Sequence, residues 1–246
     1  MKYNKQLQAE FIKLMRSLSG KYPLWQVWSD FITVTAIAIS NVFDKPRAEQ
    51  REKDYHKVIG KYDQAEQKIF PQLFAVVVDA FNVDSEQDFL GSVYMGLELG
   101  NHWMGQFFTP YSVCKLMAQV TIQNVEEEIE RKGYITLNDC ACGAGATLIA
   151  GVNEIKNQLE KSRGRFYYQN HLLVTAQDID YVTGLMCYIQ LSLLGVAGLV
   201  KIGNSLTEPM TSDDDKTNYW YTPMYFSDVW HYRRLFRSMD RPLQPT

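Results

Sequence analysis

The chain has 246 residues, 46% of them apolar, which suffices for a sizeable core in one large domain, or in one domain with a helical extension. A formal net charge of −3 gives no overall attraction to nucleic acid, so any such contact must come from a local basic patch. The longest apolar run, residues 31–39, is too short to span a bilayer and predicts a buried helix. No signal peptide is recognisable, and the four cysteines lack the spacing of a zinc site or a redox pair. We therefore expect reduced, buried thiols in a cytoplasmic protein.

Residues 1–100 have the apolar periodicity of helices. The first helix is expected to end at Ser19-Gly20. Its apolar stripe consists of Leu7, Phe11, Leu14, Met15 and Leu18. Further helices are expected over 25–43, over 69–81 and from a cap at 84 or 85 to about 99. The charged stretch 47–68 favours an exposed helix pair or a mobile connection. Together these patterns predict a helical N-terminal domain, residues 1–100, that covers one side of a second domain, residues 101–246.

The second domain begins with the segment Gly105-Gln106-Phe107-Phe108-Thr109-Pro110. Thr109 suits the cap of a helix and Pro110 its first position. The helix that follows carries one apolar face, made by Val113, Leu116, Met117 and Val120. The acidic run 126–132 is typical of a solvated helix end, which Gly133 terminates.

From Tyr134 onwards, strand patterns alternate with helix patterns. Strands are expected over 134–139, 172–177 and 199–202, with helices over 146–161 and 181–194 between them. Near-continuous apolar strands separated by helices predict a parallel sheet with both faces covered. Ligands of such sheets bind at the carboxyl ends of the strands, where Asp139, Asp178 and Asn204 fall.

The turn Asp139–Gly145 joins the first strand to a helix through two glycines. Such a turn directs backbone N–H groups at a ligand's phosphate or carboxylate, although ordinary strand–helix turns have the same composition. A helix-capping role would explain Asp178 alone, but not polar residues at three successive strand ends. The pattern therefore favours a nucleoside-type ligand.

Four segments in this order, GQFFTP, NDCACGAGATLIA, AQDID and KIGNSL, resemble the γ-type adenine-N6 DNA methyltransferases. The similarity is greatest to the modification subunits of type I restriction systems and their stand-alone relatives, and it spans about residues 85–210. It implies a Rossmann-like α/β core that binds S-adenosylmethionine, preceded by a helical region. It also implies DNA as a partner, and no membrane or metal.

The resemblance assigns the cofactor site residue by residue. Gly105, Phe107, Thr109 and Pro110 match the segment that closes over the methionine part of the cofactor. The loop under the amino acid moiety is matched by Asp139, Cys142, Gly143 and Gly145, with Asp139 expected to hold the α-amino group. Asp178 matches the ribose-binding acid, and Ile179 would pack on the adenine ring. Asn204 stands where the family usually has an Asp that accepts the adenine amino group, and a neutral amide oxygen is a weaker acceptor.

The sequence departs from the family at the catalytic motif. The expected Asn/Asp-Pro-Pro-Tyr/Phe tetrad holds the amino group of a flipped-out adenine and stacks on the base. The nearest match in register is Thr222-Pro223-Met224-Tyr225. Pro223 and Tyr225 retain a carbonyl and an aromatic ring, whereas Thr222 is shorter than Asn and a poorer acceptor. An apolar strand or an interface explains the same aromatic run.

Only three or four strands fit before the end of the sequence, so the core is expected to be a partial sheet, truncated at its C-terminal side. Its fourth-strand side would be an open apolar edge unless the aromatic tail or another chain covers it. The partner would be a second copy or a specificity or methyltransferase subunit. Two functions remain open: a DNA adenine-N6 methyltransferase of restriction–modification type or a subunit of one, and an inactive S-adenosylmethionine-binding relative with a regulatory or assembly role.

Overall fold

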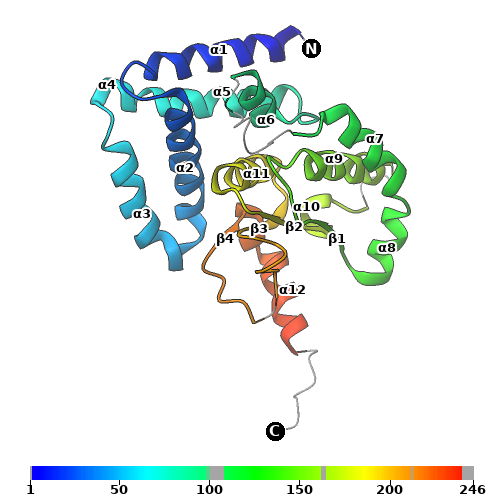
Figure 1. Ribbon diagram of the computed structural model, residues 1–246. Coiled ribbons are helices and arrows are strands. Elements are labelled where there is room, and N and C mark those ends of the chain that lie inside the picture. The colour runs from blue at the N-terminus through cyan, green and yellow to red at the C-terminus, as the bar shows by residue number, and fades with distance from the viewer. Residues whose placement is uncertain (1, 98, 100–107, 162–164, 212, 240–246) are drawn as a thin grey trace.

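The computed structural model describes residues 2–97, 99, 108–161, 165–211 and 213–239. An array of helices precedes a four-stranded sheet (Figure 1), which confirms the predicted α/β architecture with a helical N-terminal region. No helix in the described part of the chain is long and apolar enough to cross a membrane.

The helical region follows the predicted periodicity closely. Its helices are α1 (Lys2–Leu18), α2 (Leu24–Phe43), α3 (Lys45–Ile59), α4 (Gln64–Gln67), α5 (Ile69–Val83) and α6 (Phe89–Gly96). The helix expected to begin at 84 or 85 begins later, because Asp84 accepts a hydrogen bond from the N–H of Glu86 in a local turn. Asp88 caps α6 instead, since its Oδ1 accepts from the Gly91 N–H at 2.8 Å.

Aromatic side chains fill the centre of this region. The ring of Phe11 meets those of Trp28, Phe31 and Phe89 edge to face, with centroids 5.4–5.9 Å apart. This core continues without a break into the residues between the sheet and its helices. The packing therefore joins the two predicted domains through one apolar interior.

The second region contains the sheet. Its elements are α7 (Tyr111–Thr121), α8 (Val125–Lys132), β1 (Ile135–Asp139), α9 (Ala146–Lys161), α10 (Tyr168–His171), β2 (Leu172–Asp178), α11 (Tyr181–Leu193), β3 (Ala197–Ile202), β4 (Tyr219–Tyr221), the 3₁₀-helix η1 (Pro223–Phe226) and α12 (Asp228–Met239). The strand order is β1-β2-β3-β4. The first three strands are parallel, whereas β4 runs antiparallel to β3, a direction that the sequence pattern did not indicate.

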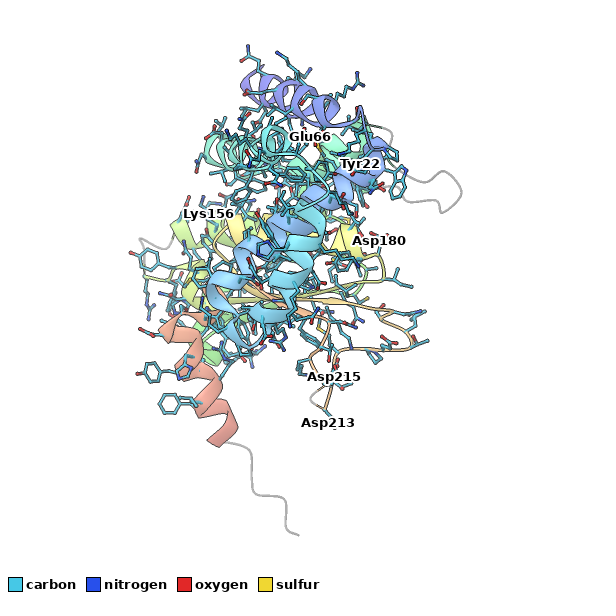
Figure 2. The ribbon with its side chains drawn as sticks, turned by 90° about the vertical axis from the view of Figure 1, so that its left-hand side faces the viewer. Tyr22, Glu66, Lys156, Asp180, Asp213 and Asp215 are labelled. Carbon is cyan, nitrogen blue, oxygen red and sulfur yellow. The ribbon has the colours of Figure 1, made fainter. Side chains whose placement is uncertain are left out.

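Helices cover one face of the sheet more completely than the other, although both faces were expected to be covered. Figure 1 shows α9 and α11 on one side of the strands, with α7 alongside α9. On the other side, Figure 2 shows α12 at one end of the strands and the loop with Asp213 and Asp215 at the other. Leu137 of β1 lies against Gly151 of α9, so its neighbours Thr136 and Asn138, which are exposed, belong to the second face. The second face is therefore partly open and carries polar side chains.

The aromatic run of the C-terminal part forms the edge beyond β3, and the helical region protects it. In the antiparallel pair, the backbone groups of Trp220 face β3 and those of Tyr219 face outward. The Tyr219 carbonyl accepts a hydrogen bond from Nη2 of Arg51 at 2.9 Å, and the guanidinium of Arg51 lies 3.9 Å from the centre of the Trp220 ring. An arginine of α3 thus occupies a position where a further strand would otherwise bind.

The cysteines are free thiols, as expected. Cys114, Cys142 and Cys187 are buried. The expectation of burial is wrong for Cys140, which is exposed in the turn after β1.

Candidate functional site

A tight turn joins β1 to α9 at the carboxyl edge of the sheet. Oδ1 of Asp139 accepts from the Ala141 N–H at 3.1 Å, which bends the chain as soon as the strand ends. The Cys142 N–H then donates to the carbonyl of Gln177 in β2 at 3.0 Å, and the Gly145 N–H donates back to Cys142 at 2.8 Å. These bonds fix the loop against β2 before α9 begins.

Both glycines of the turn are required by the backbone. Gly143 has φ of +52° and Gly145 has φ of +94°, conformations that favour glycine. A Cβ on Gly145 would lie 2.8 Å from Sγ of Cys187 in α11, and one on Gly143 would lie 3.3 Å from the ring of Phe108. The turn is therefore held between α11 and Phe108, with no room for larger residues.

Asp178 ties the end of β2 to this turn. Its Oδ2 accepts from the Gly143 N–H at 2.7 Å, and its Oδ1 accepts from the Asp180 N–H at 2.9 Å and from the Thr183 hydroxyl at 3.2 Å. Oδ2 has one partner among these bonds, so it retains a lone pair for a hydroxyl group of a ligand. The next side chain, Ile179, is 70% exposed and offers an apolar surface at the same edge.

Asn204 reaches the same edge from β3, because the Gly203 N–H donates to the backbone carbonyl of Asp178 at 2.9 Å. However, Oδ1 of Asn204 accepts from the N–H groups of Leu206 at 2.9 Å and Thr207 at 3.4 Å. The side-chain oxygen expected to receive an adenine amino group is thus engaged in its own turn.

The segment before α7 adds an aromatic wall. Thr109 and Pro110 are exposed where α7 begins, and Gly105 and Phe107 lie outside the described residues. The ring of Phe108, which the sequence analysis did not single out, contacts Gly143 and lies 5.4 Å from the ring of Tyr94 in α6. The sequence analysis assigned the aromatic contact of this segment to Phe107. The motif alone does not distinguish between two adjacent phenylalanines.

The sequence analysis also missed a buried network of hydrogen bonds behind the turn. Nε2 of Gln190 donates to Oδ1 of Asp88 and to the carbonyl of Ala144, both at 2.8 Å, while its Oε1 accepts from the Leu90 N–H at 3.0 Å. Burial raises the pKa of Asp88, which the structure surrounds almost completely. These bonds connect α6, α11 and the glycine turn. The sequence feature that could have indicated this network is Gln190, a polar residue among the apolar residues of a helix.

The comparison with known families decides the identity of the chain. A family model described as N-6 DNA Methylase matches residues 85–242, well over half of the sequence. This chain belongs to the N-6 DNA methylase family. Neither a curated protein nor a solved structure matches it significantly. The matched range starts just before α6 and includes the whole carboxyl edge described above.

In this member of the family, the segment predicted to match the catalytic tetrad, residues 222–225, lies at the opposite edge of the sheet from Asp139. Because β4 is antiparallel, it ends where β3 begins. Thr222 is fully buried there, and its hydroxyl donates to the Val196 carbonyl at 2.7 Å and accepts from the Gly198 N–H at 2.8 Å. Pro223 begins η1, which carries Tyr225 away from β3's carboxyl end.

Tyr225 itself is packed within the C-terminal segment. Its ring lies 4.7 Å from that of Tyr221, and the guanidinium of Arg234 lies 4.1 Å from it. The fold therefore does not bring Thr222, Pro223 or Tyr225 to the edge that holds Asp139 and Asp178.

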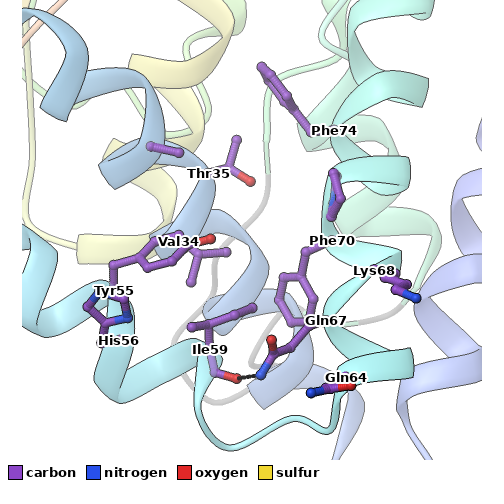
Figure 3. A pocket seen from close by; sticks show the side chains of 12 residues that line it. Val34, Thr35, Tyr55, His56, Ile59, Gln64, Gln67, Lys68, Phe70 and Phe74 are labelled. Atoms are coloured by element: carbon purple, nitrogen blue, oxygen red, sulfur yellow. Dashed lines mark hydrogen bonds between the residues drawn. The ribbon is translucent and has the colours of Figure 1, made fainter.

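The chain also has a groove of about 610 Å³ within its helical region. Figure 3 shows Val34 and Thr35 of α2 facing Phe70 and Phe74 of α5 across it, with His56 of α3 at one side. The lining is mainly apolar and lies in the helices before the matched range. The carboxyl edge, where charged and glycine residues converge, remains the candidate functional site.

Proposed function

We propose that the chain binds S-adenosylmethionine at the carboxyl edge of β1–β3 and is the methyl-donor-binding component of a DNA adenine-N6 methyltransferase of restriction–modification type. The observation that supports this most is the hydrogen bond between the Gly143 N–H and Asp178, which joins the glycine turn to a strand-end carboxylate. Family membership supports S-adenosylmethionine as the cofactor and DNA as the substrate class.

The residues at this edge suit the parts of the cofactor. We assign to the carboxylate of Asp139 the role of holding the α-amino group. The turn formed by Cys142, Gly143 and Gly145 would lie under the same amino acid moiety. The remaining lone pair of Asp178 Oδ2 suits a ribose hydroxyl. Exposed Ile179 offers an apolar surface for the adenine ring. When bound, the cofactor supplies a methyl group on a positively charged sulfur.

The methionine side of the site is assigned to the segment before α7. We assign this part to Phe107, Thr109 and Pro110, with Phe108 as an added contact next to the glycine turn. Asn204 lies at the same edge as a turn-capping residue and, in this proposal, adds only a weak contact to the amino group of the cofactor's adenine.

Transfer to DNA requires more than the donor site. An adenine amino group has its lone pair delocalised into the ring, so it needs two hydrogen-bond acceptors and a stacking ring to present it. The burial of Thr222 away from Asp139 favours a chain that binds the methyl donor but does not transfer the methyl group alone. This supports the second candidate function, a regulatory or assembly subunit, for the isolated chain.

Calorimetric titration with S-adenosylmethionine tests the donor site. We expect Asp178→Ala to weaken binding at least about tenfold, or about 1.4 kcal/mol, because the ribose contact and the support of Gly143 are both lost. Asp178→Asn keeps the shape and serves to separate loss of charge from misfolding. Asp215→Ala, which removes an exposed carboxylate elsewhere on the sheet side, should bind like the wild type. Unchanged affinity in Asp178→Ala would refute the site.

A methyl-transfer assay on mixed-sequence DNA tests the second step. We expect binding of the donor without transfer by the chain alone, and transfer only when a partner supplies acceptor-holding residues. Transfer by the isolated chain that Thr222→Val leaves intact would contradict this division and would place base presentation elsewhere.

A further inference from the structure

A fully buried side chain of α11, that of Gln190, connects helix α6 to the glycine turn. Its Nε2 donates to Oδ1 of Asp88 and to the Ala144 carbonyl, each at 2.8 Å. Its Oε1 accepts from the Leu90 N–H at 3.0 Å. The amide of Gln190 therefore has three partners, two at the start of α6 and one between the two glycines of the turn.

Asp88 is held tightly at the other end of this network. Its Oδ1 also accepts from the Gly91 N–H at 2.8 Å, and a Cβ on Gly91 would lie 2.0 Å from its Oδ2. Asp88 is only 4% exposed, so little water competes for its hydrogen bonds. The position of Asp88 therefore fixes the orientation of the Gln190 amide, which in turn fixes the direction of the Ala144 carbonyl.

Helix α6 also supports the aromatic wall of the site. The ring of Tyr94 in α6 lies 5.4 Å from the ring of Phe108, and a Cβ on Gly143 would lie 3.3 Å from that second ring. Helix α6 is thus connected to the turn twice, by hydrogen bonds through Gln190 and by ring contacts through Phe108. A shift of α6 would change two sides of the proposed cofactor site together.

Packing alone does not require polar groups between α6 and α11. Both helices carry buried apolar residues that belong to one core. Replacing both partners of a buried hydrogen bond by apolar groups of the same shape can be nearly neutral for stability. A hydrogen bond does, however, fix a distance and a direction, and here both end on the Ala144 carbonyl.

We propose that Asp88 and Gln190 are positioning residues of the cofactor site, which act through Ala144 on the glycine turn. They hold the turn in the shape that receives the amino acid moiety of S-adenosylmethionine, and they do so in the cofactor-free chain. The effect on cofactor affinity rests on the proposed function, whereas the effect on the turn does not. Because coupling between sites is reciprocal, a bound cofactor also stabilises the start of α6.

Calorimetric titration with S-adenosylmethionine tests the effect on affinity. Gln190→Leu should weaken binding at least about tenfold, because the turn loses its donor at Ala144. Asn153→Leu is the matched control, since this buried amide bonds the carbonyls of Ser85 and Ile149 rather than the turn. The control should bind within about twofold of the wild type. An equal loss of affinity in the two variants would overturn the proposal.

Variants of Asp88 and Gly91 separate geometry from stability. Asp88→Asn keeps an acceptor for the Gly91 N–H and for Gln190, so it should bind within about twofold of the wild type, whereas Asp88→Ala should bind as weakly as Gln190→Leu. Equal losses in the two Asp88 variants would contradict a role through geometry.

A further variant covers the case in which Gln190→Leu fails to fold. The methyl group of Gly91→Ala displaces the carboxyl of Asp88 without removing a hydrogen-bonding group, and it should weaken cofactor binding about fivefold. Wild-type affinity in Gly91→Ala would overturn the proposal.

Hydrogen exchange in the cofactor-free chain tests the turn directly. The Gly145 amide, which donates to the Cys142 carbonyl, should exchange about tenfold faster in Gln190→Leu and at the wild-type rate in Asn153→Leu. Unchanged exchange at Gly145 in Gln190→Leu would overturn the proposal, whatever the affinities. In the wild type, saturating S-adenosylmethionine should slow exchange of the Leu90 amide, which donates to Gln190.

The proposed function and the positioning role fail separately. Absence of S-adenosylmethionine binding by the wild type, together with faster exchange at Gly145 in Gln190→Leu, would refute the function and leave the positioning of the turn standing. Binding by the wild type that Gln190→Leu leaves unchanged would refute the positioning role and leave the function standing.

Discussion

At the scale of single residues, Gly145 is the position in the turn with least freedom. Its φ is +94°, and a Cβ there would meet Sγ of Cys187 at 2.8 Å. Gly145→Ala should therefore cost about 2 kcal/mol of unfolding free energy, because the left-handed backbone and the contact with sulfur both oppose the methyl group. Urea denaturation measures the loss.

A second change separates the two causes. Cys187→Ala removes the sulfur but not the backbone strain, so the double variant should lose less stability than the sum of the two single changes. Gly20→Ala is the matched control, since a Cβ there meets nothing within 4 Å and should cost little. Strict additivity in the double variant would show that the contact with Cys187 carries no cost.

The sequence predicts the place of some site residues and not of others. Asp139 and Asp178 fall at strand ends, so their convergence at one edge follows from the strand pattern and the parallel topology. Phe108, Asp88 and Gln190 were missed because their roles depend on contacts between segments far apart in the sequence, such as the bond from Gln190 to Asp88. Local pattern carries no information about such partners.

At the scale of elements, Arg51 links α3 to the edge strand β4. It pairs with the buried carboxylate of Asp44, bonds the Tyr219 carbonyl and stacks on Trp220. Arg51→Met should lower the unfolding free energy by about 3 kcal/mol, the low end for a broken buried pair, because Arg47 still contacts Asp44. The exposed β4 edge should also make the variant more prone to association.

Two controls sharpen the measurement for Arg51. Arg51→Lys keeps the charge but not the planar fork, so its loss in urea denaturation should be smaller than that of the Met variant. Arg131→Met breaks an exposed pair with Glu128 and should cost less than about 0.5 kcal/mol. A loss for Arg51→Met no greater than that for Arg131→Met would mean that the edge needs no protection by α3.

Elements were predicted with unequal success, for physical reasons. The helices over 2–18, 24–43 and 146–161 carry long apolar stripes, and their bounds agree with the sequence pattern. The direction of β4 was not predictable, because three aromatic residues have no periodicity that distinguishes parallel from antiparallel pairing. Contacts with Arg51 and with Tyr188 of α11, whose ring lies 5.5 Å from that of Trp220, hold the strand in place.

At the scale of the whole molecule, the two regions depend on each other more than the predicted division at residue 100 suggests. The apolar core runs from Phe11 in α1 to Trp220 in β4 without interruption. Buried polar bonds cross the same boundary, including Arg51 to Tyr219 and Gln190 to Asp88. The helical region and the sheet region thus pack together as one structural unit.

This dependence predicts that the chain unfolds as one cooperative unit. Native-state hydrogen exchange should give the amides of Phe31 in α2 and Val174 in β2 the same opening free energy and the same urea dependence, since both are completely buried in one core. A fragment of residues 101–246 should fail to show cooperative unfolding, because Trp220 and Tyr188 lose the cover of α2 and α3. An opening of α2 several kcal/mol below that of β2 would instead establish two independent domains. In that case the helical region would be a domain that unfolds independently, and Arg51 would form a contact between two domains rather than within one core.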